Sequence, residues 1–176
     1  MILGCVLAGG QSARFGSDKA LAEFAGHTLL AHAVDLLAGW CEHVVVVGRE
    51  TAPAPTLPDW PQPGMGPLGG IAAALHYAAD EGYAAVLTCG VDSLGLPETL
   101  PALLAPAPAY VAGQPVIGLW PASAAAVIEA ILKGSGRHSM LAFAEALGAR
   151  AVALYAEPAN INTLGDLAAI SARHRG

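Results

Sequence analysis

The sequence predicts an α/β protein with a single doubly wound, mostly parallel sheet. Continuous apolar runs at residues 2–7, 43–47 and 84–88 are typical of strands that are buried on both faces. Segments whose apolar residues recur at helical spacing, at residues 28–38 and 67–78, separate these runs. Strands that alternate with helices favour a sheet that is covered on both faces and joined by right-handed connections.

The loops between these elements differ in composition. Residues 8–18 form a glycine-rich loop after the first strand, whereas residues 52–66 are rich in proline and predict an irregular loop. Pro67 then suits the first turn of the second helix, because its missing N–H needs no partner there. Ligands in such sheets bind at the carboxyl ends of the strands, so we expect the loops after the first three strands to face one crevice.

The second half of the chain continues the alternation. We expect strands at residues 110–112, 116–120 and 150–154, and helices from about residue 97, at 122–133 and at 139–147, with Gly148 as a C-cap. Thr163 and Asp166 resemble a capping box at the start of a C-terminal helix. The sequence shows no repeat and no second domain, so residues 1–176 are expected to form one domain.

The composition argues against two other classes of protein. Hydrophobic residues make up 55% of the 176 residues, yet no apolar run approaches the roughly 20 residues that cross a bilayer. A net charge of −6 with eight Lys and Arg is unlike the basic surface of a general nucleic-acid binder. Three widely spaced cysteines and an N-terminus without a basic region predict a cytoplasmic protein that has no signal peptide.

The segment from Leu7 to Lys19 carries the strongest functional pattern. It starts at the end of a predicted strand, and its glycines allow backbone N–H groups to approach phosphate oxygens. Arg14 can hold a phosphate through its fork of donors, and Lys19 can act as a point charge. The glycine spacing matches neither the dinucleotide-binding pattern GxGxxG nor the Walker A loop. The segment therefore predicts a different kind of nucleotide-phosphate site.

This segment resembles the signature LAGGxSxRxGxDK of the molybdenum cofactor guanylyltransferase family, the MobA-like nucleotidyltransferases. It matches every fixed position, with Phe15 where the family usually has methionine. The resemblance implies a Rossmann-like nucleotidyltransferase fold. It also implies that Arg14 and Lys19 are catalytic residues that hold the triphosphate, and that GTP binds to Lys19 and to the backbone of Leu7, Ala8, Gly9 and Gly10.

Two more segments extend the resemblance. Residues 66–71, Gly-Pro-Leu-Gly-Gly-Ile, are similar to the family's GPL-[AG]-G-[IM] element, and the same residues predict a helix N-terminus beside the crevice. Asp59, seven residues before Gly66, falls where the family has an acidic nucleoside contact. An aspartate can accept hydrogen bonds from guanine N1–H and N2–H₂ or from ribose. Spacing alone fits a turn aspartate equally well, and the resemblance favours GTP binding.

Asp92 follows the third strand, where the family has a CDxP-like segment with a Mg²⁺-binding aspartate. A triphosphate carries about four negative charges, more than Arg14 and Lys19 offset, and a divalent cation held by a carboxylate would neutralise the rest. The resemblance therefore implies that Asp92 is a catalytic, GTP-contacting and Mg²⁺-binding residue. Val91 and Leu94 depart from the family's cysteine and proline, which leaves the shape of this loop open.

Residues 160–163, Asn-Ile-Asn-Thr, are similar to the family's NxNTP segment, with Leu164 in place of the proline. The amides of Asn160 and Asn162 can hydrogen-bond the acceptor or a metal-bound water, and Asn162 fits a turn or cap residue equally well. Arg137 lies where the family often has a basic residue near the acceptor, although a solvated arginine is the simpler interpretation.

The implied reaction is attack of the terminal phosphate of the molybdenum cofactor on the α-phosphorus of GTP, with release of pyrophosphate. The attacking phosphate is already anionic, so alignment and charge neutralisation suffice. GTP and molybdopterin or its molybdenum cofactor are the implied substrates, and molybdoenzymes or cofactor-insertion proteins are the implied transient partners. Neither nucleic acid nor a membrane is an expected partner.

Three alternatives remain open. A cytidylyltransferase that acts on the same cofactor is one, although those relatives tend to carry LAAG where this chain has Gly9 and Gly10. A sugar-1-phosphate nucleotidyltransferase is another, although such chains are usually longer. A non-catalytic nucleotide-binding protein is the third, because the loop around Asp92 and the residue after Thr163 depart from the family.

Overall fold

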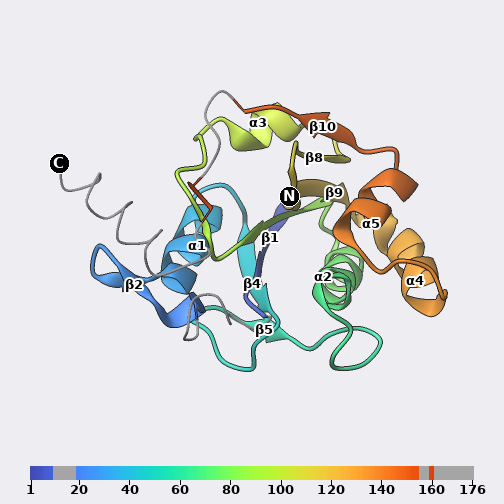
Figure 1. Cartoon of the computed structure of the whole chain (residues 1–176), viewed down its shortest axis with the longest axis horizontal. Helices are drawn as coiled ribbons and strands as arrows, with labels where there is room; N and C mark the ends of the chain where they lie inside the picture. The colour runs from blue at the N-terminus through green and yellow to red at the C-terminus, as the bar shows by residue number, and fades with distance from the viewer. Residues whose placement is uncertain (10–18, 155–158, 161–176) are drawn as a thin grey trace.

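The computed structural model describes residues 1–9, 19–154 and 159–160. Its centre is a seven-stranded sheet in the order β10-β8-β9-β6-β1-β4-β5, with helices on both faces (Figure 1). In chain order these strands are β1 (Ile2–Leu7), β4 (His43–Val47), β5 (Thr56–Leu57), β6 (Ala85–Gly90), β8 (Ala109–Val111), β9 (Gln114–Pro121) and β10 (Arg150–Val152).

The sheet is mostly parallel, as the sequence predicts. β1 lies parallel to both β4 and β6, and Cys5 faces Val45 on one side and Thr88 on the other. Only β9 runs against its neighbours β6 and β8. The connection from β8 to β9 is Ala112 and Gly113, with Gly113 at φ +80°. A link this short can join only antiparallel strands, because a parallel crossover needs a dozen or more residues.

One face of the sheet is covered by α1 (Leu29–Ala38) and α3 (Leu100–Leu104). The α1 helix begins where the side chain of Thr28 accepts a hydrogen bond of 3.0 Å from the backbone N–H of Ala31. This bond satisfies one of the unpaired donors of the first turn. Leu30, Val34 and Leu37 of α1 are buried against the sheet.

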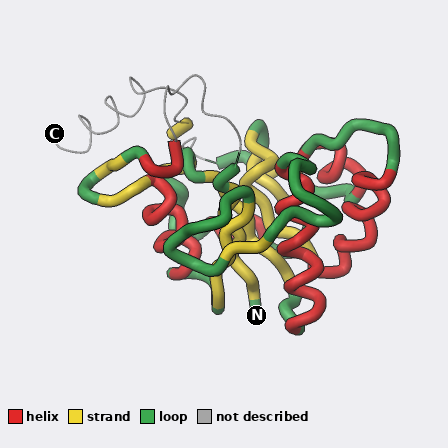
Figure 2. Tube along the Cα trace, turned by 90° about the horizontal axis from the view of Figure 1, so that it is seen from below, coloured by secondary structure: helices red, strands yellow, loops and turns green. Residues whose placement is uncertain are grey.

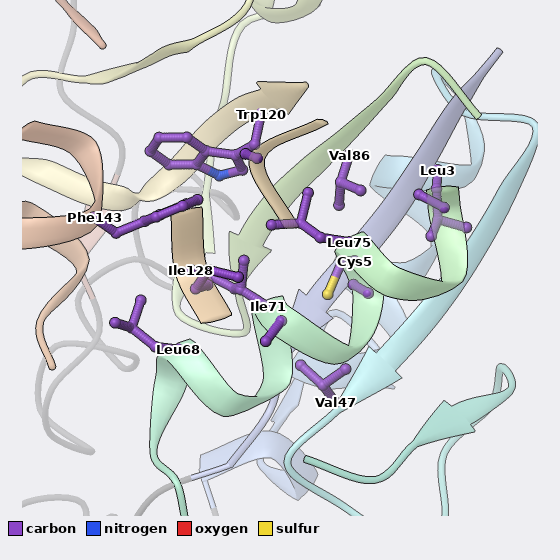
Figure 3. Close-up of a cluster of buried hydrophobic side chains, with 14 of the residues drawn as sticks. Leu3, Cys5, Val47, Leu68, Ile71, Leu75, Val86, Trp120, Ile128 and Phe143 are labelled. Carbon is purple, nitrogen blue, oxygen red and sulfur yellow. The ribbon is translucent and has the colours of Figure 1, made fainter. Parts of the chain in front are cut away.

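The other face is covered by α2 (Pro67–Glu81), α4 (Ala125–Lys133) and α5 (Met140–Ala146). Figure 3 shows Leu68, Ile71 and Leu75 of α2 in the cluster that fills this layer. Trp120 and Phe143 lie beside each other there, with ring centroids 4.9 Å apart. Figure 2 shows the strands between the two sets of helices. The helices on both faces confirm the predicted doubly wound architecture.

Thr88 and Trp120 are buried polar residues of this layer that pair with each other. The indole N–H of Trp120 donates to Thr88 Oγ1 at 3.0 Å, and the Thr88 hydroxyl donates to the carbonyl of Val116 at 2.7 Å. Burial of a hydroxyl and an indole N–H costs little when each finds a partner. These bonds tie β6 to β9, the antiparallel strand beside it.

Several short elements differ from the sequence-based expectation. The segment expected as an irregular loop at 52–66 contains β5, which pairs with β4 through Val46 and Thr56. The helix expected from about residue 97 begins at Leu100. Residues 122–124, expected as the start of a helix, form a 3₁₀ turn, η2, before α4. The strand expected at 150–154 is β10, which ends at Val152. Elements of two or three residues are too short to show a hydrophobic period, which is why sequence patterns miss them.

Five more short elements lie outside the seven-stranded sheet. They are η1 (Lys19–Leu21), the hairpin of β2 (Glu23–Phe24) with β3 (His27–Thr28), and β7 (Ser93–Leu94), which pairs with β11 (Ala159–Asn160). The C-cap of α5 is Leu147, and the expected cap residue Gly148 follows it at φ +64°. The expected C-terminal helix with Thr163 and Asp166 lies outside the described residues. Among the described helices, none has the length and apolar character needed to cross a membrane.

Candidate functional site

A cavity of about 610 Å³ lies where β1 and β4 end and α2 begins. This volume falls within the range of small-molecule sites, and the carboxyl edge of a parallel sheet is where such sites form. Its described lining consists of Leu7, Gly9, Val47, Gly48, Asp59, Gly64, Gly66, Pro67 and Gly70. The loops after the first two predicted strands therefore do face one crevice.

Two glycines bring the loops after β1 and β4 into backbone contact. A Cβ atom on Gly9 would lie 2.9 Å from Gly48 Cα, and one on Gly48 would overlap the backbone nitrogen of Gly9. Gly48 also has φ +88°, a conformation that side chains disfavour. The backbone N–H of Ala8 donates to the carbonyl of Val47 at 2.9 Å, which fixes the crossing. Backbone rather than side chains thus forms this wall of the cavity.

The N-terminus of α2 forms the opposite wall. Gly66 is its N-cap at φ +74° with no side-chain cap, and Pro67 follows in the first turn. A helix start of this kind carries a partial positive charge and favours anionic or electron-rich ligand atoms. Gly70 allows the helix to sit close to β4, because a Cβ there would lie 2.6 Å from Val47 Cγ2.

Asp59 is the charged residue among the described lining residues of this cavity. One of its carboxylate oxygens, Oδ2, accepts a hydrogen bond of 3.2 Å from the backbone N–H of Met65. The next residue, Trp60, donates its backbone N–H to the carbonyl of Gly69 in α2 at 3.0 Å. These two bonds hold the carboxylate beside the start of α2, where it can accept further hydrogen bonds from a ligand.

Lys19 and Asp92 form a second charged group. Lys19 Nζ lies 3.4 Å from Asp92 Oδ2, and the two side chains are 18% and 27% exposed. Lys19 begins η1 after the first loop, and Asp92 follows the end of β6. Gly90 leaves room for the carboxylate, since a Cβ there would lie 2.9 Å from Asp92 Oδ1. Two residues that the sequence predicts for one site are therefore neighbours in space.

The expected site residues thus fall into two groups. Leu7, Gly9 and Asp59 line the cavity, whereas Lys19 and Asp92 pair beside the ends of β1 and β6 and do not line it. Ala8 is buried behind the lining. Arg14, Gly10 and Asn162, which are also expected site residues, lie outside the described residues.

Two weaker candidates are placed in part. The backbone of Asn160 in β11 pairs with Ser93, next to Asp92, so the C-terminal asparagine segment returns to the loop after β6. Arg137 is exposed in the connection between α4 and α5.

Sequence reasoning missed Val47, Gly48 and Gly64 as lining residues. A glycine directly after four valines, at the carboxyl end of a predicted strand, is a pattern that points to Gly48.

A single carboxylate can serve a magnesium ion whose other ligands come from a substrate. Mg²⁺ is commonly held in proteins by one or two carboxylates together with waters and phosphate oxygens. Within the described ranges, no group of three or more His, Cys, Asp or Glu gathers as a protein-only metal site. Asp92 has the chemistry that a phosphate-bound Mg²⁺ requires.

Burial, with smaller effects of Cys41 and Asp92, raises the pKa of nearby Cys89 to about 12, so its thiol stays neutral.

Comparison with protein families gives a match over most of the chain. Residues 4–152 match the model of the MobA-like NTP transferase domain. A molybdenum cofactor guanylyltransferase of Acidiphilium cryptum is 37% identical over 95% of this chain and 92% of its own length. Another of that name, from Rhodobacter capsulatus, is 36% identical over 99% and 97%.

Solved structures show the same fold. Molybdopterin-guanine dinucleotide biosynthesis protein A from Archaeoglobus fulgidus superimposes with a TM-score of 0.77 at 21% identity, over 98% of each chain. The 2-C-methyl-D-erythritol 4-phosphate cytidylyltransferase of Thermus thermophilus superimposes with a TM-score of 0.63 at 18% identity, again over 98% of each chain. At these identities the likeness establishes the α/β fold with its mixed sheet.

Proposed function

The chain belongs to the MobA-like NTP transferase family, and we propose from this premise that it transfers GMP from GTP to the terminal phosphate of the molybdenum cofactor. The products are the guanine dinucleotide form of the cofactor and pyrophosphate. Near full-length relatives named molybdenum cofactor guanylyltransferase support this assignment. The structural observation that carries it is the Asp59 carboxylate in the wall of a cavity otherwise lined, among described residues, by glycine, proline and aliphatic side chains.

The cavity suits the nucleoside part of GTP. Guanine offers two donors on one edge, N1–H and N2–H₂, and a carboxylate accepts from both. Asp59 supplies this acceptor beside the start of α2. Leu7 and the Gly9 backbone provide an apolar surface and main-chain donors on the other wall. We assign Asp59 to guanine recognition and residues 7–10 to the base, ribose or phosphates.

The transfer depends on alignment of the two phosphate groups and on neutralisation of their negative charge more than on proton transfer. An oxygen of the acceptor phosphate forms a bond to the α-phosphorus, and the bond from that phosphorus to the bridging oxygen of pyrophosphate breaks. Both reacting groups are anionic, so a fixed cation stabilises the transition state. We propose that Lys19, with Arg14, holds the triphosphate for this displacement. The Asp92 carboxylate keeps the Lys19 ammonium close to the ends of β1 and β6.

We further propose that Mg²⁺ assists and that Asp92 holds it. The ion supplies charge neutralisation at the triphosphate and at the departing pyrophosphate. Asp92 is suited to this role because it lies beside Lys19, the residue proposed to bind the same phosphates. Its side chain is partly shielded from solvent, which strengthens electrostatic interactions relative to bulk water.

Location and partners are also part of this proposal. The three cysteines are free, which is ordinary in a reducing cytoplasm where thiols persist. We propose a cytoplasmic enzyme that passes its product to molybdoenzymes or cofactor-insertion proteins through transient contacts. The rival cytidylyltransferase differs from it in base preference, and a non-catalytic binding protein differs in releasing no pyrophosphate.

The test is pyrophosphate release from GTP, CTP, ATP and UTP in parallel, with Mg²⁺ and the molybdopterin-type acceptor. We expect release with GTP alone, and we expect Asp59→Asn to weaken this preference because an amide offers N1–H and N2–H₂ one acceptor instead of two. Release with CTP would keep the site and overturn the assignment of the base. GTP binding without release from any nucleotide would favour the binding protein.

A further inference from the structure

Trp60 anchors the loop that carries Asp59. The loop between β5 and α2 is exposed along most of its length, notably at Pro58 and from residue 61 to residue 64. Trp60 and Met65 are exceptions, because both are partly buried and pack against the core cluster on the α2 face of the sheet. The backbone N–H of Trp60 also donates to the carbonyl of Gly69 at 3.0 Å. Trp60, the residue next to Asp59, therefore connects this part of the exposed loop to the folded body.

The indole of Trp60 contacts two helices. Its ring centroid lies 4.9 Å from that of His76 in α2, with the planes tilted by 38°. Lys133 Nζ, at the end of α4, lies 5.6 Å from the centroid of the same indole, within the range of a cation–π interaction. These two helices cover the same face of the sheet (Figure 1). Trp60 thus links the cavity loop to both.

His76 lies beside a carboxylate of the neighbouring helix. Its Nε2 atom lies 2.8 Å from Glu129 Oε1 of α4, although the angles do not make this contact a hydrogen bond. Trp60 therefore packs against His76 and Lys133, and Glu129 lies next to His76. None of these three residues lines the cavity among the described residues.

Asp59 has few restraints of its own. Its side chain accepts the 3.2 Å hydrogen bond from the backbone N–H of Met65, a residue at the far end of the loop that packs against the core cluster. The adjacent Trp60 supplies both the backbone bond to α2 and the packing of the ring. A shift of about 1 Å in a group that positions a substrate can cost on the order of 100-fold in rate.

We infer that Trp60 is a positioning residue that fixes the Asp59 carboxylate at the nucleoside cavity, with His76 and Lys133 holding the indole. The inference rests on the proposed function, in which Asp59 recognises guanine. It adds a residue that acts through Asp59 and makes no contact with the nucleotide itself. Loss of the indole should therefore impair GTP recognition and leave the displacement step, which depends on Lys19 and Asp92, largely unchanged.

The experiment compares steady-state kinetics of Trp60→Ala, Trp60→Phe, Asp59→Asn and the double variant Trp60→Ala/Asp59→Asn in the full chain. We expect Trp60→Ala to raise KM for GTP about tenfold with kcat within about twofold, because it removes ground-state recognition. Trp60→Phe should restore most of the loss, since a phenyl ring keeps much of the packing. The double variant should be no worse than Asp59→Asn, because both changes remove one interaction.

Trp40→Phe is the matched control. Trp40 is partly buried and follows α1 on the opposite face of the sheet, so its replacement should leave KM for GTP unchanged. Lys133→Met tests the cluster without removing the indole, and we expect a rise in KM of about threefold. Circular dichroism of each variant shows whether it is folded. If Trp60→Ala does not fold, Trp60→Phe and Lys133→Met decide the outcome.

The failures of the two proposals are distinguishable. A wild-type protein that neither binds nor turns over GTP would overturn the proposed function itself. Independent losses in the double variant, or a fall in kcat with unchanged KM, would overturn the role of Trp60 while leaving that function intact. If Trp60→Ala does not fold, an unchanged KM for GTP in Lys133→Met would also overturn the role of Trp60 and leave the proposed function intact.

Discussion

The ion pair of Lys19 with Asp92 joins two loops that are 73 residues apart in the sequence. A single pair at this partly exposed position contributes little to folding, about 0–1 kcal/mol, because the attraction is offset by the desolvation and ordering of both side chains. In the function we propose, the pair places a cation for phosphate and a carboxylate for a metal at the same edge of the sheet. Function at this pair should therefore be separable from stability.

Asp92→Ala tests that separation. We expect the variant to lose Mg²⁺-dependent pyrophosphate release by about 100-fold or more, because the change removes the carboxylate proposed to hold the metal. The free energy of unfolding in urea should fall by no more than about 1 kcal/mol, since only a partly exposed ion pair is lost. Pyrophosphate release and urea titration measure the two effects in one preparation.

Asp80→Ala is the matched control for this variant. Asp80 is exposed near the end of α2 and lines no cavity among the described residues, so activity and stability should both be unchanged. Retained turnover in Asp92→Ala would contradict the metal assignment. Loss of activity in both variants would point to a general effect of charge and not to a site.

At the level of single residues, sequence patterns predict the members of local motifs better than their neighbours in space. Lys19 and Asp92 are found because the segments that contain them, after the first and third predicted strands, resemble motifs of the family. Gly48 is missed although its place after four valines marks it, because its contact with the Gly9 backbone forms only when the two strands pack. No pattern along the chain encodes such contacts, since they arise when separate strands and helices pack.

At the level of elements, the position of α2 is set by its glycines. Gly69 and Gly70 lie in the first turns of the helix. A Cβ on Gly69 would lie 2.5 Å from Met65 Cβ, and one on Gly70 would lie 2.6 Å from Val47 Cγ2, so neither position has room for a side chain. The helix start can therefore approach the carboxyl end of β4 and close the cavity. A larger residue at either position would separate the two walls.

Gly70→Ala is predicted to destabilise the fold by about 1–3 kcal/mol, although alanine is the better helix former. The added methyl group would lie 2.6 Å from Val47 Cγ2, so α2 or β4 must shift. Urea unfolding measures the loss. Gly136→Ala serves as the control, because no atom outside its chain neighbours lies within 4 Å of the added group. Equal stability of Gly70→Ala and the wild type would show that this contact is not tight.

The longer elements follow the sequence patterns closely. The predicted bounds of β1 and β4 agree with the structure, and α1 and α5 begin directly after Thr28 and Ser139, whose side chains cap them. β5 and the hairpin of β2 with β3 are missed because two residues show no alternation. The reversed direction of β9 follows from its two-residue link to β8, whereas its pairing with β6 is a long-range contact that local spacing does not reveal.

At the level of the whole molecule, the order of the strands assembles the site. β1 lies between β4 and β6, so the three loops that carry Gly9, Gly48 and Asp92 emerge side by side at one edge. Two separate hydrophobic clusters, one on each face, hold this arrangement. The rigid body of the domain thus positions loops that themselves contain little regular structure.

The central claim is transfer of the α-phosphoryl group of GTP, as GMP, to the molybdenum cofactor. Its most direct test is incubation of the wild-type protein with GTP labelled at the α-phosphate, Mg²⁺ and the molybdopterin-type acceptor, followed by separation of the products. The account predicts that the label appears in a dinucleotide form of the acceptor, with an equal amount of pyrophosphate. Label that stays in GTP, despite measured GTP binding, or that is released as free GMP would contradict it.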